Sequence, residues 1–243
     1  MLTIVIPMAG AGTRFAQAGY QKPKPFIDVG GKPMIVRVLE NLAYPNARYV
    51  LVARKEQLES EPFLVQQIER NFNVIFLQLD RLTEGTVCTV LFARRQFKDE
   101  HPLLIANCDQ IVDIDIRDFI NDCQERELDG SMLTFVNEAG DPKWSYARLG
   151  SDNLVCEVRE KAAISVYATV GIYFYTRSRD FVDAALDMWI AGDRVNNEYY
   201  TCPTYNHAIR SGLRIGIHNI PTSAMHGLGT PEDLNTFTSQ INQ

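Results

Sequence analysis

Short apolar runs alternate along the chain with longer segments in which apolar residues recur every three or four positions. The first run, residues 3–6, is β-branched and apolar throughout, which is typical of a strand buried on both faces of a parallel sheet. Comparable runs predict further strands at residues 48–53, 73–78, 102–110, 130–136 and 167–175.

Helical periodicity fills several of the gaps between these strands. Residues 33–42 place apolar side chains on one helical face, and Pro33 is acceptable in the first turn. Further helices are expected over residues 56–70 and 114–125, and from a cap at Ser178 to a stop at Gly192. Strands separated by helices imply parallel crossovers. The expected fold is therefore α/β, a Rossmann-like mixed, mainly parallel sheet flanked by helices.

A β-hairpin is predicted in the second half of the chain. Residues 144–149 and 154–158 have strand character, and the polar residues 150–153 between them are typical of a turn. This hairpin subregion, about residues 143–161, is expected to stand above the main sheet. No repeat, low-complexity tract or linker is seen, so residues 1–243 are expected to form a single domain.

Composition excludes several classes of protein. A formal net charge of −6 argues against a nucleic-acid carrier, because such proteins usually display a basic face. The five cysteines are odd in number and lack C-x-x-C spacing, which favours a reducing cytoplasm over a disulfide framework or a zinc site. The apolar start lacks a basic region and is too short to span a membrane, so neither a secretion signal nor a membrane anchor is expected.

The first strand leads directly into a glycine-rich turn, residues 8–14. Gly10 and Gly12 lack a β-carbon, so the backbone can adopt positive φ, approach a ligand closely and form a nest of N–H groups for anions. Arg14 adds a planar positive charge. The alternative is a strand-to-helix connection whose small residues serve only tight packing.

Two common phosphate-binding motifs are excluded. The dinucleotide fingerprint would need glycine where Phe15 stands, and a Walker loop would need Ser or Thr after Gly31-Lys32, where Pro33 stands. The next basic residue of interest, Lys24, lies between Pro23 and Pro25, and these prolines predict an extended segment that cannot be helix.

A carboxylate, Asp109, stands at the end of the apolar run that begins at Pro102. A carboxylate on a rigid strand can hold Mg²⁺ through one oxygen while phosphates and waters complete the octahedron. Nearby Asp113, Asp115 and Asp118 are interpreted as surface and helix-start acids, because acids favour the first helical turn.

Three segments, residues 10–14, 23–25 and 31–35, occur in an order that is more specific than any one of them. Together they resemble the amino-terminal signature of the sugar-1-phosphate nucleotidyltransferases, the nucleotide-sugar pyrophosphorylases. The resemblance implies an Mg²⁺-dependent enzyme that transfers a nucleoside monophosphate from a nucleoside triphosphate to a sugar 1-phosphate and releases pyrophosphate. Such enzymes supply nucleotide sugars and surface-polysaccharide precursors. Because that family is often oligomeric, a homo-oligomer is one expectation.

The resemblance also implies where the donor nucleotide binds. Asp109 stands at the position of the family's first metal-binding aspartate, and Gly85 with Thr86 stands in its base-reading loop, although a plain helix start would also explain that pair. The remaining expected nucleotide contacts are Ala9, Gly10, Ala11, Gly12, Thr13, Arg14 and Lys24.

The acceptor site implied by the resemblance lies beneath the hairpin. Glu160-Lys161 resembles the pair that holds the sugar and its phosphate, although such dipeptides are common on solvated surfaces. The other expected acceptor contacts are Thr169, Gly171, Arg194 and Glu198. The chain departs from the family pattern at Ala162, at the spacing between Arg194 and Glu198, and at Gly227, where the family usually has its second metal-binding aspartate.

Nucleotidyl transfer requires little from a general base, because a phosphate monoester loses its second proton near pH 6, roughly, and is already a nucleophile. The difficulty is to bring two polyanions together, which needs fixed cations, N–H groups, a metal and alignment. We therefore expect residues 10–13 to cradle the triphosphate, Arg14 to neutralise the leaving pyrophosphate, Lys24 to bridge the reacting phosphates, Asp109 to hold Mg²⁺ and Lys161 to receive the acceptor phosphate.

Three alternatives remain open at this stage. The acceptor could be a non-sugar phosphate, phosphocholine-like or a polyol phosphate, with CTP as the donor. A non-catalytic nucleotide-sugar-binding regulatory protein would explain Gly227 but leaves Arg14, Lys24 and Asp109 without a purpose. A metal-dependent glycosyltransferase using Asp109 and Asp113 would leave the glycine turn unexplained.

Overall fold

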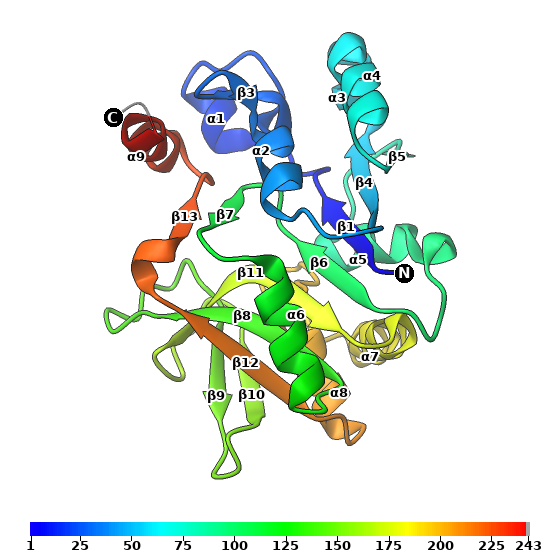
Figure 1. Cartoon of the computed structure of the whole chain (residues 1–243), viewed down its shortest axis with the longest axis vertical. Coiled ribbons are helices and arrows are strands. Elements are labelled where there is room, and N and C mark those ends of the chain that lie inside the picture. Colours follow the sequence, from blue (N-terminus) through cyan, green and yellow to red (C-terminus); the bar gives the residue numbers. More distant parts are fainter. Residues whose placement is uncertain (242–243) are drawn as a thin grey trace.

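The computed structural model describes residues 1–241, and its centre is a nine-stranded mixed sheet (Figure 1). The strand order is β10-β9-β11-β6-β1-β4-β5, and β8 joins the sheet by pairing with both β11 and β12. The strands are β1 Thr3–Pro7, β4 Arg48–Arg54, β5 Val74–Leu79, β6 Leu103–Ala106, β8 Gly130–Val136, β9 Tyr146–Leu149, β10 Val155–Arg159, β11 Tyr167–Tyr175 and β12 Ile215–Ile220.

Helices cover both faces of this sheet, as the alternation of strands and helices predicts. The larger core cluster joins α2, α3, α4 and α6 to one face, and a second cluster joins α5, α7 and α8 to the other. These helices are α2 Met34–Asn41, α3 Lys55–Ser60, α4 Pro62–Asn71, α5 Thr86–Phe92, α6 Ile116–Glu125, α7 Ser178–Ala191 and α8 Thr204–Arg210.

The central strand β1 shows why both faces must be covered. Ile4 and Ile6 belong to the first core cluster, whereas Val5 between them belongs to the second. All three are fully buried. Burial of one such side chain contributes about 1.5–3 kcal/mol, so two-sided packing fixes this strand at the centre of the sheet.

Strand direction changes within the sheet. From β5 through β4 and β1 to β6 the neighbours run parallel, and their carboxyl ends therefore meet at one edge. Strand β11 then pairs antiparallel with β6, with β8 and with β9. Strands β9 and β10 pair antiparallel with each other, as expected for residues 144–158.

A third, smaller core joins the two ends of the chain. The short β13 (Met225–Gly227) pairs with β7 (Gln110–Val112), and α9 (Pro231–Ile241) follows. Leu234 and Phe237 of α9 pack with Phe15 of α1 (Thr13–Gln17), and Figure 1 shows α9 beside α1. The C-terminal helix thereby supports the glycine turn. The backbone N–H of Asp233 donates to Thr230 Oγ1 at 3.1 Å, so the Thr230 side chain caps the start of α9.

Three predictions about helix and strand bounds were wrong. The helix expected at 56–70 is two helices, because Pro62 lacks the N–H that would continue α3. Ser178 does not cap α7. It is the first helical residue, and its hydroxyl donates to the carbonyl of Lys98 at 2.9 Å. The strand expected at 102–110 ends at Ala106, and a separate strand begins at Gln110.

The proline-rich segment was also predicted incorrectly. Lys24–Phe26 forms one turn of 3-10 helix, η1, rather than extended chain. Its two hydrogen bonds are donated by the N–H groups of Phe26 and Ile27. Neither donor is a proline, so Pro23 and Pro25 do not prevent the turn.

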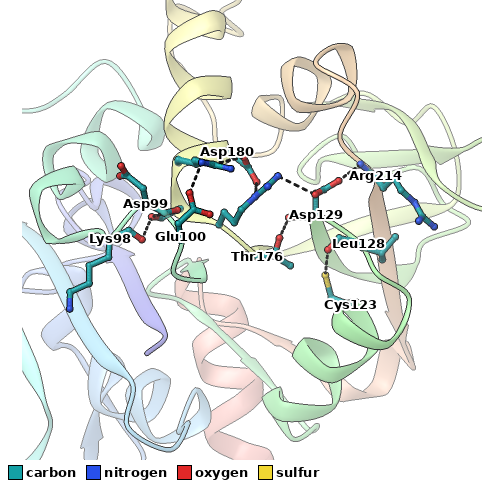
Figure 2. Close-up of polar contacts among 12 residues, drawn as sticks. Lys98, Asp99, Glu100, Cys123, Leu128, Asp129, Thr176, Asp180 and Arg214 are labelled. Carbon is teal, nitrogen blue, oxygen red and sulfur yellow. Dashed lines mark hydrogen bonds and ion pairs between the residues drawn. The ribbon is translucent and has the colours of Figure 1, made fainter.

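A polar network fastens the edge of the sheet opposite the glycine turn, as Figure 2 shows. The carboxylate of Asp129 accepts from the backbone N–H of Arg214 at 2.8 Å and from Arg177 at 3.3 Å. Arg177 also donates to Asp180 at 2.8 Å, and Thr176 donates to the carbonyl of Asp129. The network ties the starts of β8, β12 and α7 to the end of β11.

Replacing Asp129 tests this network. Asp129→Ala removes an acceptor of two hydrogen bonds that involve charged groups, and we expect the free energy of unfolding to fall by about 1–3 kcal/mol. Asp187→Ala, at an exposed position of α7, is the matched control and should change it by less than about 0.5 kcal/mol. Urea denaturation of the two variants measures both values. Equal losses would contradict the role given to Asp129.

None of the helices within residues 1–241 combines the length and apolar content needed to cross a membrane.

Candidate active site

The glycine turn follows β1 at the edge where the parallel strands end. Gly12 has a φ of 64° and is the N-cap of α1. This left-handed conformation favours glycine. Gly10 does not adopt positive φ, contrary to expectation, and a β-carbon there would meet nothing within 4 Å. Only Gly12 is therefore required by backbone conformation.

Two side chains that the sequence did not single out hold the turn. Arg54, at the end of β4, donates from Nε to the carbonyl of Ala9 at 3.0 Å. Gln57 donates to the carbonyl of Gly10 at 3.4 Å and is itself buried. Because Gln57 also accepts from the backbone N–H of Arg54 at 2.8 Å, the start of α3 and the glycine turn form one unit.

A cleft of about 480 Å³ opens at the glycine turn. Its walls come from the segments after β1 and β6, from η1 and from the loop before α5. All the predicted nucleotide-binding residues line it, namely Ala9, Gly10, Ala11, Gly12, Thr13, Arg14, Lys24, Gly85 and Thr86. Asp109 and Glu198 line it as well. The fold thus gathers residues from four distant parts of the sequence into one cavity.

Lys24 and Asp109 form an ion pair in this cleft. Their side chains are only 19% and 14% exposed. Burial lowers the pKa of the Lys24 ammonium, but the charge of Asp109 and its hydrogen bond act in the opposite direction, and the pKa is raised overall. Lys24 therefore keeps its positive charge at neutral pH. Lys24, which was predicted to bridge the reacting phosphates, thus stands beside Asp109, the predicted Mg²⁺ ligand.

The donor set around Asp109 suits a single Mg²⁺ ion held mainly by phosphates and water. The described residues contain no group of three or more His, Cys, Asp or Glu side chains arranged to hold a metal. Gly227 contributes no carboxylate, and a β-carbon at Gly229 would lie 3.2 Å from Oδ2 of Asp109. Mg²⁺ commonly binds through one or two carboxylates plus substrate phosphates, so Asp109 is the residue that could hold such an ion here.

The loop before α5 is bonded to the segment that contains Glu198. The backbone N–H of Tyr199 donates to the carbonyl of Glu84 at 2.8 Å, and that of Val87 donates to the carbonyl of Tyr199 at 3.0 Å. Gly85 has a φ of 115°, and a β-carbon there would lie 2.5 Å from the Tyr199 nitrogen. The close approach of these two backbones therefore explains the glycine.

The structure separates Arg194 from the other predicted acceptor residues. Its guanidinium pairs with Glu84 at 2.7 Å and lies 4.4 Å from the centre of the Tyr199 ring. Asn196 and Asn197 both have positive φ, and Val195 bridges to Glu198 across this tight turn. The turn directs the chain back, so that Glu198 lines the cleft and Arg194 lines neither cavity.

A second pocket, of about 220 Å³, adjoins the cleft and contains the remaining predicted acceptor residues. Glu160, Lys161, Thr169 and Gly171 all line it. Thr86, Asn107 and Tyr200 line both cavities, so the two spaces adjoin. Sequence analysis identified neither Asn107 nor Tyr200. Asn107 was detectable as a polar residue that ends the same buried run as Asp109.

Charged groups in the second pocket are held by neighbouring hydroxyls. Burial raises the pKa of Glu160, against the hydrogen bond from Ser145 and the charge of Lys161, which lower it. The Lys161 ammonium donates to the Tyr200 hydroxyl at 2.6 Å. Lys161 also has a φ of 55°, which is uncommon for a residue other than glycine. Residues with such backbone conformations cluster at functional sites.

Comparison with known proteins agrees with this arrangement. The model of the nucleotidyl transferase family matches residues 4–200, which is most of the chain. The chain belongs to the nucleotidyl transferase family. The resemblance in the amino-terminal signature is thereby confirmed.

Individual relatives of the chain are distant. It is 27% identical over 185 residues to the mannose-1-phosphate guanyltransferase of Pichia angusta, an alignment that covers 74% of the chain and 50% of that protein. It is 25% identical over 158 residues to the bifunctional protein GlmU of Methanococcus aeolicus, covering 65% and 35%. The chain thus spans half or less of the length of these relatives.

Solved structures share the fold. The nucleoside-diphosphate-sugar pyrophosphorylase of Vibrio cholerae RC9 superposes with a TM-score of 0.83 at 24% identity, covering 98% of this chain and all of that one. The family match ends at residue 200, so β12, β13 and α9 lie outside it. Gly227 lies in this part of the chain, beyond the family match.

A pair of glycine substitutions tests the conformation of the turn. Gly12→Ala forces a side chain into the left-handed region and should lower the free energy of unfolding by about 1–2 kcal/mol. Gly10→Ala is the matched control, since its β-carbon would meet open space, and it should lower stability by less than half as much. Chemical denaturation followed by fluorescence measures both. Comparable losses in the two variants would be evidence against the turn described here.

Proposed function

We propose that this protein is an enzyme that transfers a nucleoside monophosphate from a nucleoside triphosphate to a sugar 1-phosphate and releases pyrophosphate. The observation that carries the proposal is the convergence of Arg14, Lys24 and Asp109 with the glycine turn in one cleft that adjoins a second pocket. Membership of the nucleotidyl transferase family supports the reaction class. The names of the relatives, which include a mannose-1-phosphate guanyltransferase, support a sugar phosphate as the acceptor.

Nucleotidyl transfer requires the protein to align the two phosphate groups and to stabilise their negative charge. The acceptor phosphate oxygen attacks the α-phosphorus of the triphosphate, the bond to the bridging oxygen breaks, and pyrophosphate leaves with the electron pair. Residues 10–13 hold the triphosphate, Arg14 offsets charge on the leaving pyrophosphate, and Lys161 binds the acceptor phosphate. Lys24 bridges the reacting phosphates from its place beside Asp109. Fixed charges in a partly buried site need no reorganisation during the reaction.

Asp109 would hold Mg²⁺, which supplies charge neutralisation on the phosphates when it is bound. The proposed setting is cytoplasmic, in the synthesis of nucleotide sugars for polysaccharides. A non-catalytic regulatory protein would bind nucleotide without releasing pyrophosphate. Formation of a nucleotide sugar by the purified chain, identified by mass, therefore separates the two functions, and a panel of nucleoside triphosphates identifies the base.

Two cations should dominate the rate. Arg14→Ala and Lys24→Ala each remove a preorganised charge and should lower the turnover number by about 10²–10³. Lys22→Ala is the matched control, because Lys22 is two residues from Lys24 but its side chain is 54% exposed and pairs with Glu61. It should retain turnover within about twofold. Continuous detection of pyrophosphate measures all three, and full activity of Lys24→Ala with an unchanged fold would refute its role.

Metal removal tests Asp109. A chelator should abolish turnover, and added Mg²⁺ should restore it, because the phosphates and the single carboxylate bind the ion together. Asp109→Asn loses the charge but keeps the size of the side chain, so it should need a higher Mg²⁺ concentration for half-maximal rate. A titration of pyrophosphate release against Mg²⁺ gives that concentration. An unchanged Mg²⁺ requirement in Asp109→Asn would exclude Asp109 as the ligand.

A further inference from the structure

Gln110 is a buried side chain that the proposed mechanism does not use. It begins β7, directly after Asp109, and only 9% of its surface is exposed. Its Oε1 atom has no hydrogen-bond partner among the described residues. The side chain lines the second pocket, of about 220 Å³. A buried amide oxygen without a partner costs about 1–3 kcal/mol, so a hydrogen bond to a ligand there would recover stabilisation.

The backbone of β11 leaves room for this amide. Gly171 has a φ of 92°, and a β-carbon there would lie 3.0 Å from Oε1 of Gln110 and still closer to the Asn107 amide. Any larger residue would displace both side chains from the pocket wall. The register of β11 against β8 is irregular between Thr169 and Tyr173, where Gly171 lies. This irregular stretch makes the space that the amides of Asn107 and Gln110 occupy.

The chemistry of the neighbouring groups indicates what would fill the site. Glu160 and Gln110 both line the pocket, and each side chain carries oxygen that can accept a hydrogen bond. A hydroxyl group of a ligand can hydrogen-bond to such side chains, because it donates one hydrogen bond and can also accept others. A quaternary ammonium carries no hydrogen to donate and would leave the amide unpartnered.

The aromatic residues of the pocket do not offer a cage for such a cation. The Lys143 ammonium lies 5.1 Å from the centre of the Trp144 ring, and the Lys161 ammonium lies 4.4 Å from that of Tyr200. The third aromatic, Tyr173, bonds through its hydroxyl to Thr169 at 3.2 Å. Cation recognition by aromatic faces needs those faces to be accessible, and two of them already carry a lysine of this chain.

We propose that Gln110 is a specificity-determining residue of the acceptor pocket, which reads a hydroxyl group of a sugar or polyol phosphate and thereby rejects phosphocholine-like acceptors. The inference rests on the proposed function, because it takes the second pocket as the acceptor site. It goes further by naming the residue and the substrate group that meet there, and by separating hydroxylated acceptors from quaternary ammonium phosphates.

The experiment compares Gln110→Leu with the unaltered protein in two measurements. Calorimetric titration gives the dissociation constants of glucose 1-phosphate, ribitol 5-phosphate and phosphocholine, and pyrophosphate release gives kcat and KM for the same compounds. Gln110→Leu keeps the size of the side chain but cannot hydrogen-bond. We expect kcat/KM and affinity for the preferred hydroxylated acceptor to fall about 10- to 100-fold, with KM for the nucleoside triphosphate unchanged.

Deoxy analogues of the preferred acceptor identify the hydroxyl. Removal of one hydroxyl should weaken binding to the unaltered protein but not to Gln110→Leu, because the partner is already gone. Gln110→Glu, which retains an acceptor oxygen, serves as the second variant and should keep part of the affinity. Ser131→Ala is the matched control, since Ser131 Oγ is the other buried side-chain atom without a partner among the described residues and lies outside the pocket. Its acceptor affinity should not change.

The outcomes separate this inference from the proposed function. Tight binding of phosphocholine, or equal losses for every deoxy analogue in Gln110→Leu, would overturn the role of Gln110 while nucleotidyl transfer itself stands. Absence of pyrophosphate release with every acceptor and nucleotide would instead overturn the proposed function, and the calorimetric comparison would still decide whether Gln110 reads a hydroxyl.

Discussion

The ion pair between Lys24 and Asp109 is the constraint on which the arrangement of the site depends. Both side chains are largely shielded from water, so separating them would leave a buried charge without compensation, which costs several kcal/mol. The pair joins the turn η1, which follows the glycine segment, to the segment that follows β6. Because β1 and β6 are adjacent parallel strands, their carboxyl ends bring these two segments to the same place.

The change of strand direction at β11 creates the second half of the site. A sheet that remained parallel beyond β6 would need another helical crossover, whereas the antiparallel β11 passes directly beside Asn107, whose backbone N–H donates to the carbonyl of Gly171 at 3.0 Å. The second pocket therefore adjoins the cleft. Thr86 accepts from the backbone N–H of Thr201 at 3.1 Å, which fastens the outer wall of both cavities.

Much of this could be read from the sequence because it depends on short-range patterns. The apolar runs predicted eight of the nine strands of the central sheet within a few residues, since burial on both faces of a sheet requires uninterrupted hydrophobicity. Strand β12 was not predicted. The glycine turn, Lys24 and Asp109 were recognisable because each has an unusual local setting. Errors occurred where one residue changes local geometry, as at Pro62, or where a single 3-10 turn tolerates prolines, as at Lys24–Phe26.

The sequence by itself determined the α/β class and predicted residues that line the cleft, because strand ends and glycine turns are encoded in consecutive residues. Only the tertiary structure decided the acceptor half. Arg194 was expected in that pocket but pairs with Glu84, since two left-handed asparagines reverse the chain beyond it. Gln110, which no local pattern marks, faces the pocket because Gly171, 61 positions away in the numbering, leaves space for it. Contacts between distant segments depend on how the whole chain packs, so the residues of one segment alone do not predict them.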